Sequence, residues 1–285
     1  MASPTVLRRR IGNELRKMRD ERKMPGASVA KAMGWSDSKL SRIESGESPL
    51  SDKDAKSILV HYDIPESEIR QFLTLVRRSR QPGWWHSYGD ALPRWFQTYI
   101  GFEDDASSIR DWQPESIPGL LQTEAYASEV IRAANIELTP DEIEQRAAAR
   151  TQRQEILDRP NPPRLWSILN ESALRRIVGS RSLMREQLLH LVTMAETRPN
   201  VTVQVLSFEV GAHAGMGYNF TILSYSDIPG SVVYSEDGTS AVYLDKEPDV
   251  ARYEDSFQRL VAASTSPERS LAWIKEIAER YGKDA

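Results

Sequence analysis

The sequence predicts two domains: a mostly α N-terminal bundle of five helices and a C-terminal α+β domain with a flanked β-sheet. Short amphipathic segments punctuated by Gly, Pro and Ser fill the first 80 residues. Segments rich in Val, Ile, Tyr and Thr follow later in the chain, between longer helical patterns. A polar stretch with adjacent Pro and Gly, RSRQPG at 78–83, separates the two textures. We therefore predict one domain over residues 1–80 and a second over 84–285.

Apolar spacing and capping residues define the N-terminal helices. Gly34 suits the C-terminal cap of a short helix, because glycine tolerates the left-handed backbone that such caps adopt. Ser36 and Ser51 suit N-caps, because a serine oxygen accepts a hydrogen bond from a free backbone N–H of the first turn. The five predicted helices span residues 6–19, 28–34, 37–45, 50–62 and 67–78.

The C-terminal domain begins helical and continues as a sheet flanked by helices. Thr139 and Pro140 form a helix-start signal, and the dense aromatics of 84–102 predict packing of this domain onto a connecting helix. A glycine-bearing segment, 211–220, lies between two strands and predicts a hairpin loop rather than a phosphate cradle. A turn that leads into a helix is predicted over 116–134. Further helices are predicted over 139–157, 180–196, 248–263 and 267–281, and strands over 164–172, 200–208, 218–226, 231–237 and 239–245.

The net charge of −4 conceals an uneven distribution. Residues 1–80 carry 17 Lys and Arg against 11 Asp and Glu, whereas the remainder carries 20 against 30. A basic module on an acidic body indicates a polyanion partner. The alternative is that these charges only form solvated faces.

Several classes of protein are disfavoured by what the sequence lacks. It has no cysteine and no apolar run of membrane-spanning length, so we expect a cytoplasmic protein without membrane contact. The four histidines lack metal-ligand spacing, and nucleophile and nucleotide-binding motifs are missing. We therefore expect no catalytic residue, no metal and no cofactor, and a protein that is not an enzyme.

Two short helices joined by a tight turn at Gly34 form a helix-turn-helix arrangement, whose second helix enters the DNA major groove. Leu40 and Ile43 would pack this helix against the core of the bundle, while its polar residues face outward. Arg42 has the geometry to grip guanine, and Asp37 to accept from cytosine. The predicted contacts to double-stranded DNA are Ser36, Asp37, Ser38, Lys39, Ser41, Arg42, Arg8 and Arg10. Of these, Asp37, Ser38 and Arg42 are expected at bases, and Lys39, Arg8 and Arg10 at phosphates. The alternative is a helical bundle used for protein contacts.

Five polar residues are candidates for an effector or partner site in the C-terminal domain. Three arginines recur at helical spacing and share one face, which fits either an anion pocket or pairing within the helix, with Glu142 four residues before Arg146. Gln122 and Glu171 stand in apolar settings, where they line a pocket or interface or bond to backbone groups. The candidates are Gln122, Arg146, Arg150, Arg153 and Glu171.

The stretches LRRRIGNELRKMRDERKM and SVAKAMGWSDSKLSRIESG resemble Cro/repressor-type regulators of the XRE family. IPGLLQTEAYA, NESALRRIVG and NVTVQVLSF resemble regulators of filamentous actinobacteria that join this motif to a long C-terminal domain of uncharacterised function. The resemblance implies a transcriptional regulator encoded beside a small partner protein and linked to antibiotic production or development. A homodimer is expected, because one short helix reads few base pairs. The alternatives are an antitoxin-like protein that neutralises its neighbour and, third, an enzyme.

Overall fold

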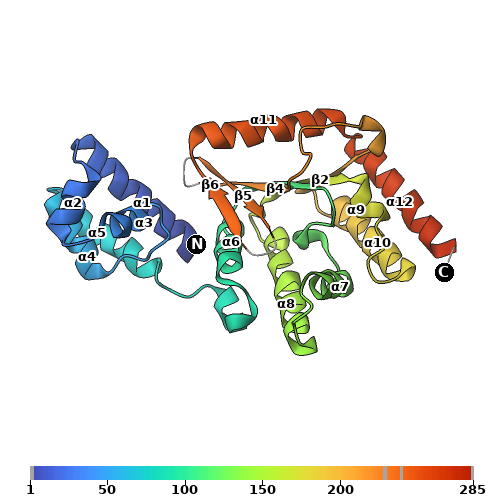
Figure 1. Cartoon of the computed structure of the whole chain (residues 1–285), viewed down its shortest axis with the longest axis horizontal. Helices are drawn as coiled ribbons and strands as arrows, with labels where there is room; N and C mark the ends of the chain where they lie inside the picture. The colour runs from blue at the N-terminus through green and yellow to red at the C-terminus, as the bar shows by residue number, and fades with distance from the viewer. Residues whose placement is uncertain (1–2, 227–229, 238–239, 284–285) are drawn as a thin grey trace. The chain divides into compact units, whose positions relative to one another are not determined.

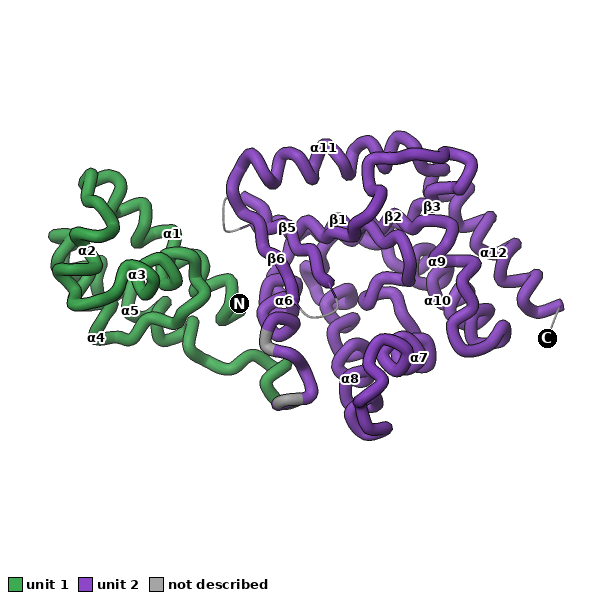
Figure 2. Tube along the Cα trace, in the orientation of Figure 1, with its two compact units in different colours: residues 1–87 green, residues 88–285 purple. Residues whose placement is uncertain are grey.

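A computed structural model describes residues 3–226, 230–237 and 240–283 of the chain. The chain divides into two compact units, residues 1–87 and 88–285 (Figure 2). The division falls a few residues after the RSRQPG stretch at 78–83. Each unit has its own hydrophobic core.

The first unit contains five α-helices, as the sequence predicts. Ser36 and Ser51 cap two of them through their side-chain oxygens, and Gly34 ends another with φ 67°. A 3₁₀ segment, Trp84–Ala91, crosses the division between the units. The α-helices are α1 Pro4–Glu21, α2 Gly26–Met33, α3 Asp37–Glu44, α4 Asp52–His61 and α5 Glu66–Arg78.

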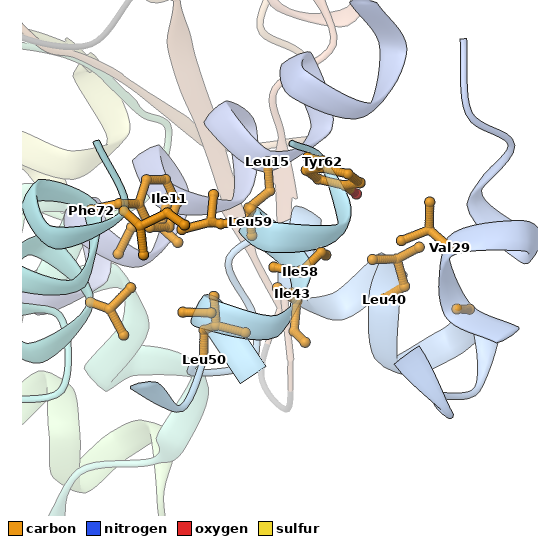
Figure 3. Packing of buried hydrophobic residues seen from close by; sticks show 14 residues of the cluster. Ile11, Leu15, Val29, Leu40, Ile43, Leu50, Ile58, Leu59, Tyr62 and Phe72 are labelled. Atoms are coloured by element: carbon orange, nitrogen blue, oxygen red, sulfur yellow. The ribbon is translucent and has the colours of Figure 1, made fainter. Parts of the chain in front are cut away.

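The core of the first unit fixes α3 in place. Leu40 and Ile43 are 3% and 2% exposed and belong to a cluster drawn from all five helices (Figure 3). Gly12 of α1 allows the close approach, because a Cβ there would lie 2.5 Å from the carbonyl oxygens of Ile43 and Glu44. Burial of a Leu or Ile side chain contributes about 1.5–3 kcal/mol. One face of α3 is thereby committed to the interior.

The second unit is built on a six-stranded mixed sheet in the order β3-β2-β1-β4-β5-β6. The first three strands of the chain run parallel, and β4, β5 and β6 add antiparallel. The strand predicted to begin at residue 239 has that residue outside the described part of the chain. The strands are β1 Ser108–Gln113, β2 Arg164–Asn170, β3 Val201–Leu206, β4 Phe220–Ser224, β5 Ser231–Glu236 and β6 Ala241–Leu244.

Two features of the sheet differ from the sequence-based expectation. The central strand β1 was not anticipated, because its sequence SIRDWQ places two charged residues in its middle. The connection over residues 207–219 is not a hairpin loop, since β3 and β4 are not neighbours and the chain crosses β2 and β1 between them. Trp112 of β1 anchors this crossing by donating to the carbonyl oxygens of Gly215 and Tyr218, at 2.9 and 3.0 Å.

Helices cover both faces of the sheet. Figure 1 shows α11 along one face and α7 and α8 on the other side. Alternation along β1 sends Trp112 into the cluster that contains Phe257 of α11, and Asp111 to the opposite face. The α-helices are α6 Arg94–Glu103, α7 Glu124–Ala134, α8 Pro140–Arg153, α9 Glu171–Arg175, α10 Arg181–Thr197, α11 Glu247–Ala263 and α12 Pro267–Lys283, and the 3₁₀ segments are η2 Gly119–Leu121, η3 Gln154–Asp158 and η4 Phe208–Val210.

Candidate functional site

The outward face of α3 is polar and open. Its residues are short or charged, and the predicted DNA contacts Ser36, Asp37, Ser38, Ser41 and Arg42 are all exposed. The opposite face is buried and includes Glu44, which is 6% exposed. The helix therefore presents one strip of polar side chains to a partner while its other side belongs to the core.

The start of α3 is fixed by its own residues. The Ser36 hydroxyl accepts a hydrogen bond from the backbone N–H of Lys39 at 3.2 Å. The hydroxyl oxygens of Ser36 and Ser38 lie 3.0 Å apart, within hydrogen-bond distance. Only three residues separate α2 from α3, and the left-handed Gly34 supplies the reversal. Together these features form the predicted helix-turn-helix.

A buried ion pair that the sequence did not reveal joins α3 to α1. The Arg19 guanidinium donates from Nε and Nη2 to the two carboxylate oxygens of Glu44, at 2.7 and 2.9 Å. Its Nη1 donates to the Met24 carbonyl at 3.1 Å. The hydrogen bonds with Glu44 raise the pKa of Arg19. Because the two partners lie 25 residues apart, no local sequence pattern predicts this ion pair. The pair fixes the orientation of α3 relative to α1.

The two cations on α3 differ in their surroundings. Lys39 Nζ lies 3.2 Å from an Asp54 carboxylate oxygen and 4.4 Å from the centre of the Trp35 ring. Arg42 is 63% exposed in its side chain, and its closest carboxylate, from Glu47, is 3.9 Å away. Arg42 is therefore the freer of the two to bind a ligand without first breaking a short contact.

Arg8 and Arg10 belong to a different part of the first unit. Arg8 is half-buried and donates to the Ser79 carbonyl and the Thr5 hydroxyl, and burial lowers its pKa. Arg10 bonds to Glu14 at 3.0 Å. A Cβ on Gly46 would meet the backbone of Arg9, so this segment passes the C-terminal end of α3 rather than its N-terminal end. As phosphate contacts, Arg8 and Arg10 stay a prediction.

In the second unit, three of the five predicted residues line one cavity of about 140 Å³. Arg150 donates to the Gln122 side-chain oxygen at 2.9 Å. Arg153 binds both carboxylate oxygens of Glu103 at 2.7 Å and is 4% exposed. Burial lowers the pKa of Arg150 to about 10, so the group remains a cation at neutral pH. For Arg153, burial opposes the charge, but attraction to Glu103 raises the pKa above its ordinary value.

The other two predicted residues lie outside this cavity. Glu171 begins α9, where its carboxylate accepts from Arg175 at 2.5 Å and from the Phe208 backbone N–H at 2.9 Å. Among the described residues, no ion pair joins Arg146 to Glu142. The Glu142 carboxylate accepts instead from Thr139, at the start of the same helix. The structure therefore shows no ion pair between Arg146 and Glu142, although the charge of Arg146 still attracts Glu142, and the other two arginines of this face line the cavity.

Asp111 of β1 is a cavity residue that sequence analysis missed. It is 4% exposed, and its Oδ1 accepts from Gln113 at 2.9 Å and Thr221 at 3.0 Å. Burial raises its pKa to about 7, and the negative charges of Glu103 and Glu236 contribute in the same direction. Its position opposite Thr221 in the register of β1 and β4 places it in the middle of the sheet. Only the tertiary structure reveals this environment.

Neither a membrane span nor a metal cluster emerges from the part of the chain that the structure describes. None of the described helices is both long and apolar enough to cross a bilayer. No group of three or more His, Asp or Glu side chains among those residues is arranged to hold a metal ion.

Comparison with known proteins separates the chain in the same way as its structure does. Residues 10–72 match a family described as a helix-turn-helix domain, which supports a DNA-binding regulator. No curated protein matches the chain. Residues 96–276 match a family described as a domain of unknown function (DUF5753). Because that match covers more than half of the 285 residues, the chain belongs to the DUF5753 family, here with an N-terminal helix-turn-helix domain.

Proposed function

We propose that the chain is a sequence-specific regulator of transcription that inserts α3 into the major groove of double-stranded DNA. The observation that carries this proposal is the exposed polar face of α3 on a helix whose other face is locked by Leu40, Ile43 and the Arg19–Glu44 pair. Base readout needs a preorganised helix, because hydrogen bonds to base edges depend on direction as well as distance. The fixed orientation of α3 supplies that preorganisation.

The proposed roles on α3 follow from chemistry and exposure. Arg42 presents a free planar fork that matches the N7 and O6 acceptors of guanine. Asp37 and Ser38, in the first turn, face the bases at the end of the helix that enters the groove. Lys39 exchanges its Asp54 partner for a phosphate, a contact that positions the protein without specifying sequence.

We further propose that two copies act together in the cytoplasm, each reading one half-site, and that the chain acts without catalysing a reaction. The resemblance to XRE-type actinobacterial regulators supports the first part and suggests control of antibiotic production or development. The missing nucleophile and cofactor motifs in the sequence support the second part.

The test is selection of bound duplexes from a random library, with Arg42→Ala in parallel. We expect a two-fold symmetric site with half-sites about 10 base pairs apart, and a loss of about 1–3 kcal/mol of discrimination at one base position in the variant. Arg70→Ala is the matched control, because Arg70 of α5 is similarly exposed and has its acidic partner at a similar distance, 4.0 Å. Unchanged preference in Arg42→Ala would place the reading residues elsewhere.

A second function, binding of a small partner protein by the C-terminal unit, is favoured by one observation. The crossing over residues 207–219 exposes four large apolar side chains, with Phe208 55% and Met216 60% exposed and Val210 and Tyr218 each 37% exposed. Exposed apolar surface of this kind marks interaction sites. Co-purification with the product of an adjacent small gene, lost in Met216→Lys, would support it. Growth inhibition by that product alone would favour the antitoxin-like alternative.

A further inference from the structure

We propose that the cavity of the second unit is a binding site for an amino-acid-sized zwitterion, a small molecule with one carboxylate and one ammonium group. This site is separate from α3 and goes beyond the proposed DNA binding. It lies between the sheet, which contributes Asp111, and helices α6 and α8, which contribute Glu103 and Arg150. The proposal rests on two charged groups of this cavity, Arg150 and Asp111, which form no ion pair with a side chain of opposite charge among the described residues. Glu236, which also lines the cavity, attracts Arg150 without forming an ion pair with it.

The first of these charges is Arg150. Among the residues that the structure describes, its only hydrogen bond is donated from Nη1 to the Gln122 amide oxygen, a neutral acceptor. Its neighbour Arg153, one helical turn away, is neutralised by Glu103. The guanidinium fork of Arg150 therefore retains donors for a planar anion. A carboxylate is the matching group, because it accepts two parallel hydrogen bonds from such a fork.

The second charge is Asp111. Both of its hydrogen bonds within the described residues reach Oδ1, and both donors, Gln113 and Thr221, are neutral. The second carboxylate oxygen therefore has capacity for a donor from a bound molecule. An ammonium group fits, because it supplies both a donor and the positive charge that this buried carboxyl group lacks. Burial of an unpaired charge is costly, so a ligand that compensates both charges is strongly favoured over water alone.

Size and lining define the class of ligand more closely. A volume of about 140 Å³ is close to that of an engineered cavity of about 150 Å³ that holds one benzene molecule. This is room for a small organic molecule and too little for a nucleotide. Phe96, Tyr99 and Tyr234 border the same space and offer aromatic surface to an apolar side chain. An α-amino acid combines all three features: a carboxylate, an ammonium group and an apolar side chain.

The experiment measures the melting temperature of the full chain with each of the twenty standard L-amino acids in turn, without DNA. A ligand at about 100 times its Kd raises the melting temperature of a domain of this size by about 5–10 °C. We expect such a shift for at least one amino acid, and calorimetric titration then gives its Kd. Because no DNA is present, failure here leaves the DNA-binding proposal untouched.

Three variants decide whether the cavity is the site. Arg150→Gln and Asp111→Asn each remove one charge at nearly constant size, and each should weaken binding at least about tenfold. Arg146→Gln is the control, since Arg146 lies on the same helix outside the cavity and its loss should leave Kd unchanged. If Arg150→Gln fails to fold, Asp111→Asn carries the test. The proposal is overturned if no amino acid shifts the melting temperature, or if all three variants bind alike.

Discussion

Each of the two units contains a buried, bidentate Arg–Glu ion pair, and the two pairs differ in their role. Arg19 and Glu44 join α1 to α3 through bonds of 2.7 and 2.9 Å. Arg153 and Glu103 join α8 to α6 through two bonds of 2.7 Å. The first pair sits beneath a helix whose outer face is open, whereas the second lines the cavity of the second unit.

This difference locates the working surface of each unit. Around Arg19 the remaining donor Nη1 is used by the Met24 carbonyl, so the pair is closed and only orients α3. Around Arg153, the nearby Arg150 and Asp111 keep unused hydrogen-bonding capacity toward the cavity. These contacts are consistent with the proposals that the first unit binds DNA through the exposed face of α3 and that the second binds a ligand in its cavity. Substitutions that break one pair at a time test this contrast.

The largest expected effect comes from Glu103→Gln. The change strands the Arg153 cation, which is 4% exposed, and breaking such a buried pair costs about 3–5 kcal/mol. Chemical denaturation of the full chain, followed by tryptophan fluorescence, measures the loss. The control is Asp104→Asn at the next residue, whose partner Arg159 is 41% exposed, with an expected cost of at most about 1 kcal/mol. Equal losses in both variants would mean that burial does not set the strength of the pair.

Asp111 gives the next largest effect, and its sign depends on pH. Its folded pKa of about 7 lies above the ordinary 3.8, so the folded state holds a proton that the unfolded state releases between these values. The stabilisation is therefore complete below about pH 4 and is lost as pH rises through about 7. The acids facing it, Glu103 and Glu236, reinforce this direction.

Asp111→Asn should remove that pH dependence. At pH 8 the variant avoids a buried charge and should be more stable than the native chain by roughly 2–4 kcal/mol. At pH 4 the two should be nearly equal. Unfolding free energies measured across this range check the prediction. A variant that is less stable at pH 8 would show that the charge of Asp111 is compensated in the folded protein.

Signals between residues close together in the sequence predict much of the first unit. Contacts between residues far apart in the sequence cannot be predicted in this way. Ser36, Gly34 and Ser51 act within a few residues of themselves, and the structure confirms their caps. Glu44 and Arg19 are 25 residues apart, and only the packing of α1 against α3 brings them together. The exposed face of α3 was therefore predictable from the sequence, whereas the Arg19–Glu44 pair that fixes the orientation of α3 was not.

The second unit shows the same limit more strongly. Helical spacing placed Arg150 and Arg153 on one face, but their partners come from α6 and from the turn that carries Gln122. Sequence analysis missed strand β1 because the two charged residues in its middle, Arg110 and Asp111, are untypical of a central strand. Arg110 pairs with Glu254 of α11 at 2.7 Å, whereas Asp111 accepts hydrogen bonds only from neutral donors among the described residues, such as Thr221. Charged residues in the middle of a sheet can be explained only when the tertiary structure shows which residues they contact.

Glu44→Gln should have a smaller effect on stability than Glu103→Gln, because Arg19 retains more solvent contact than Arg153. We expect a loss of about 1.5–3 kcal/mol in the first unit. DNA affinity should fall for every sequence while base preference is retained, since the pair orients α3 and touches no base. Selection of bound duplexes from the random library with Glu44→Gln measures both the DNA affinity and the base preference. Glu66→Gln, which removes the exposed acidic partner of Arg70 on α5, is the control; a changed base preference in Glu44→Gln alone would mean that α3 has shifted.

The smallest effect on stability is expected for Lys39→Gln, which breaks a surface contact with Asp54 and costs about 0.2–1 kcal/mol. Its effect on DNA binding should be larger than that on folding. Loss of one phosphate contact releases one counterion fewer, so the slope of log K against log salt should shrink by about 0.9. Titrations at several salt concentrations measure this slope. Asp54→Asn is the informative partner variant: it frees Lys39 in the unbound protein, so it should strengthen binding to all sequences without changing their ranking. If Lys39→Gln altered the ranking instead, Lys39 would be reading bases rather than the backbone.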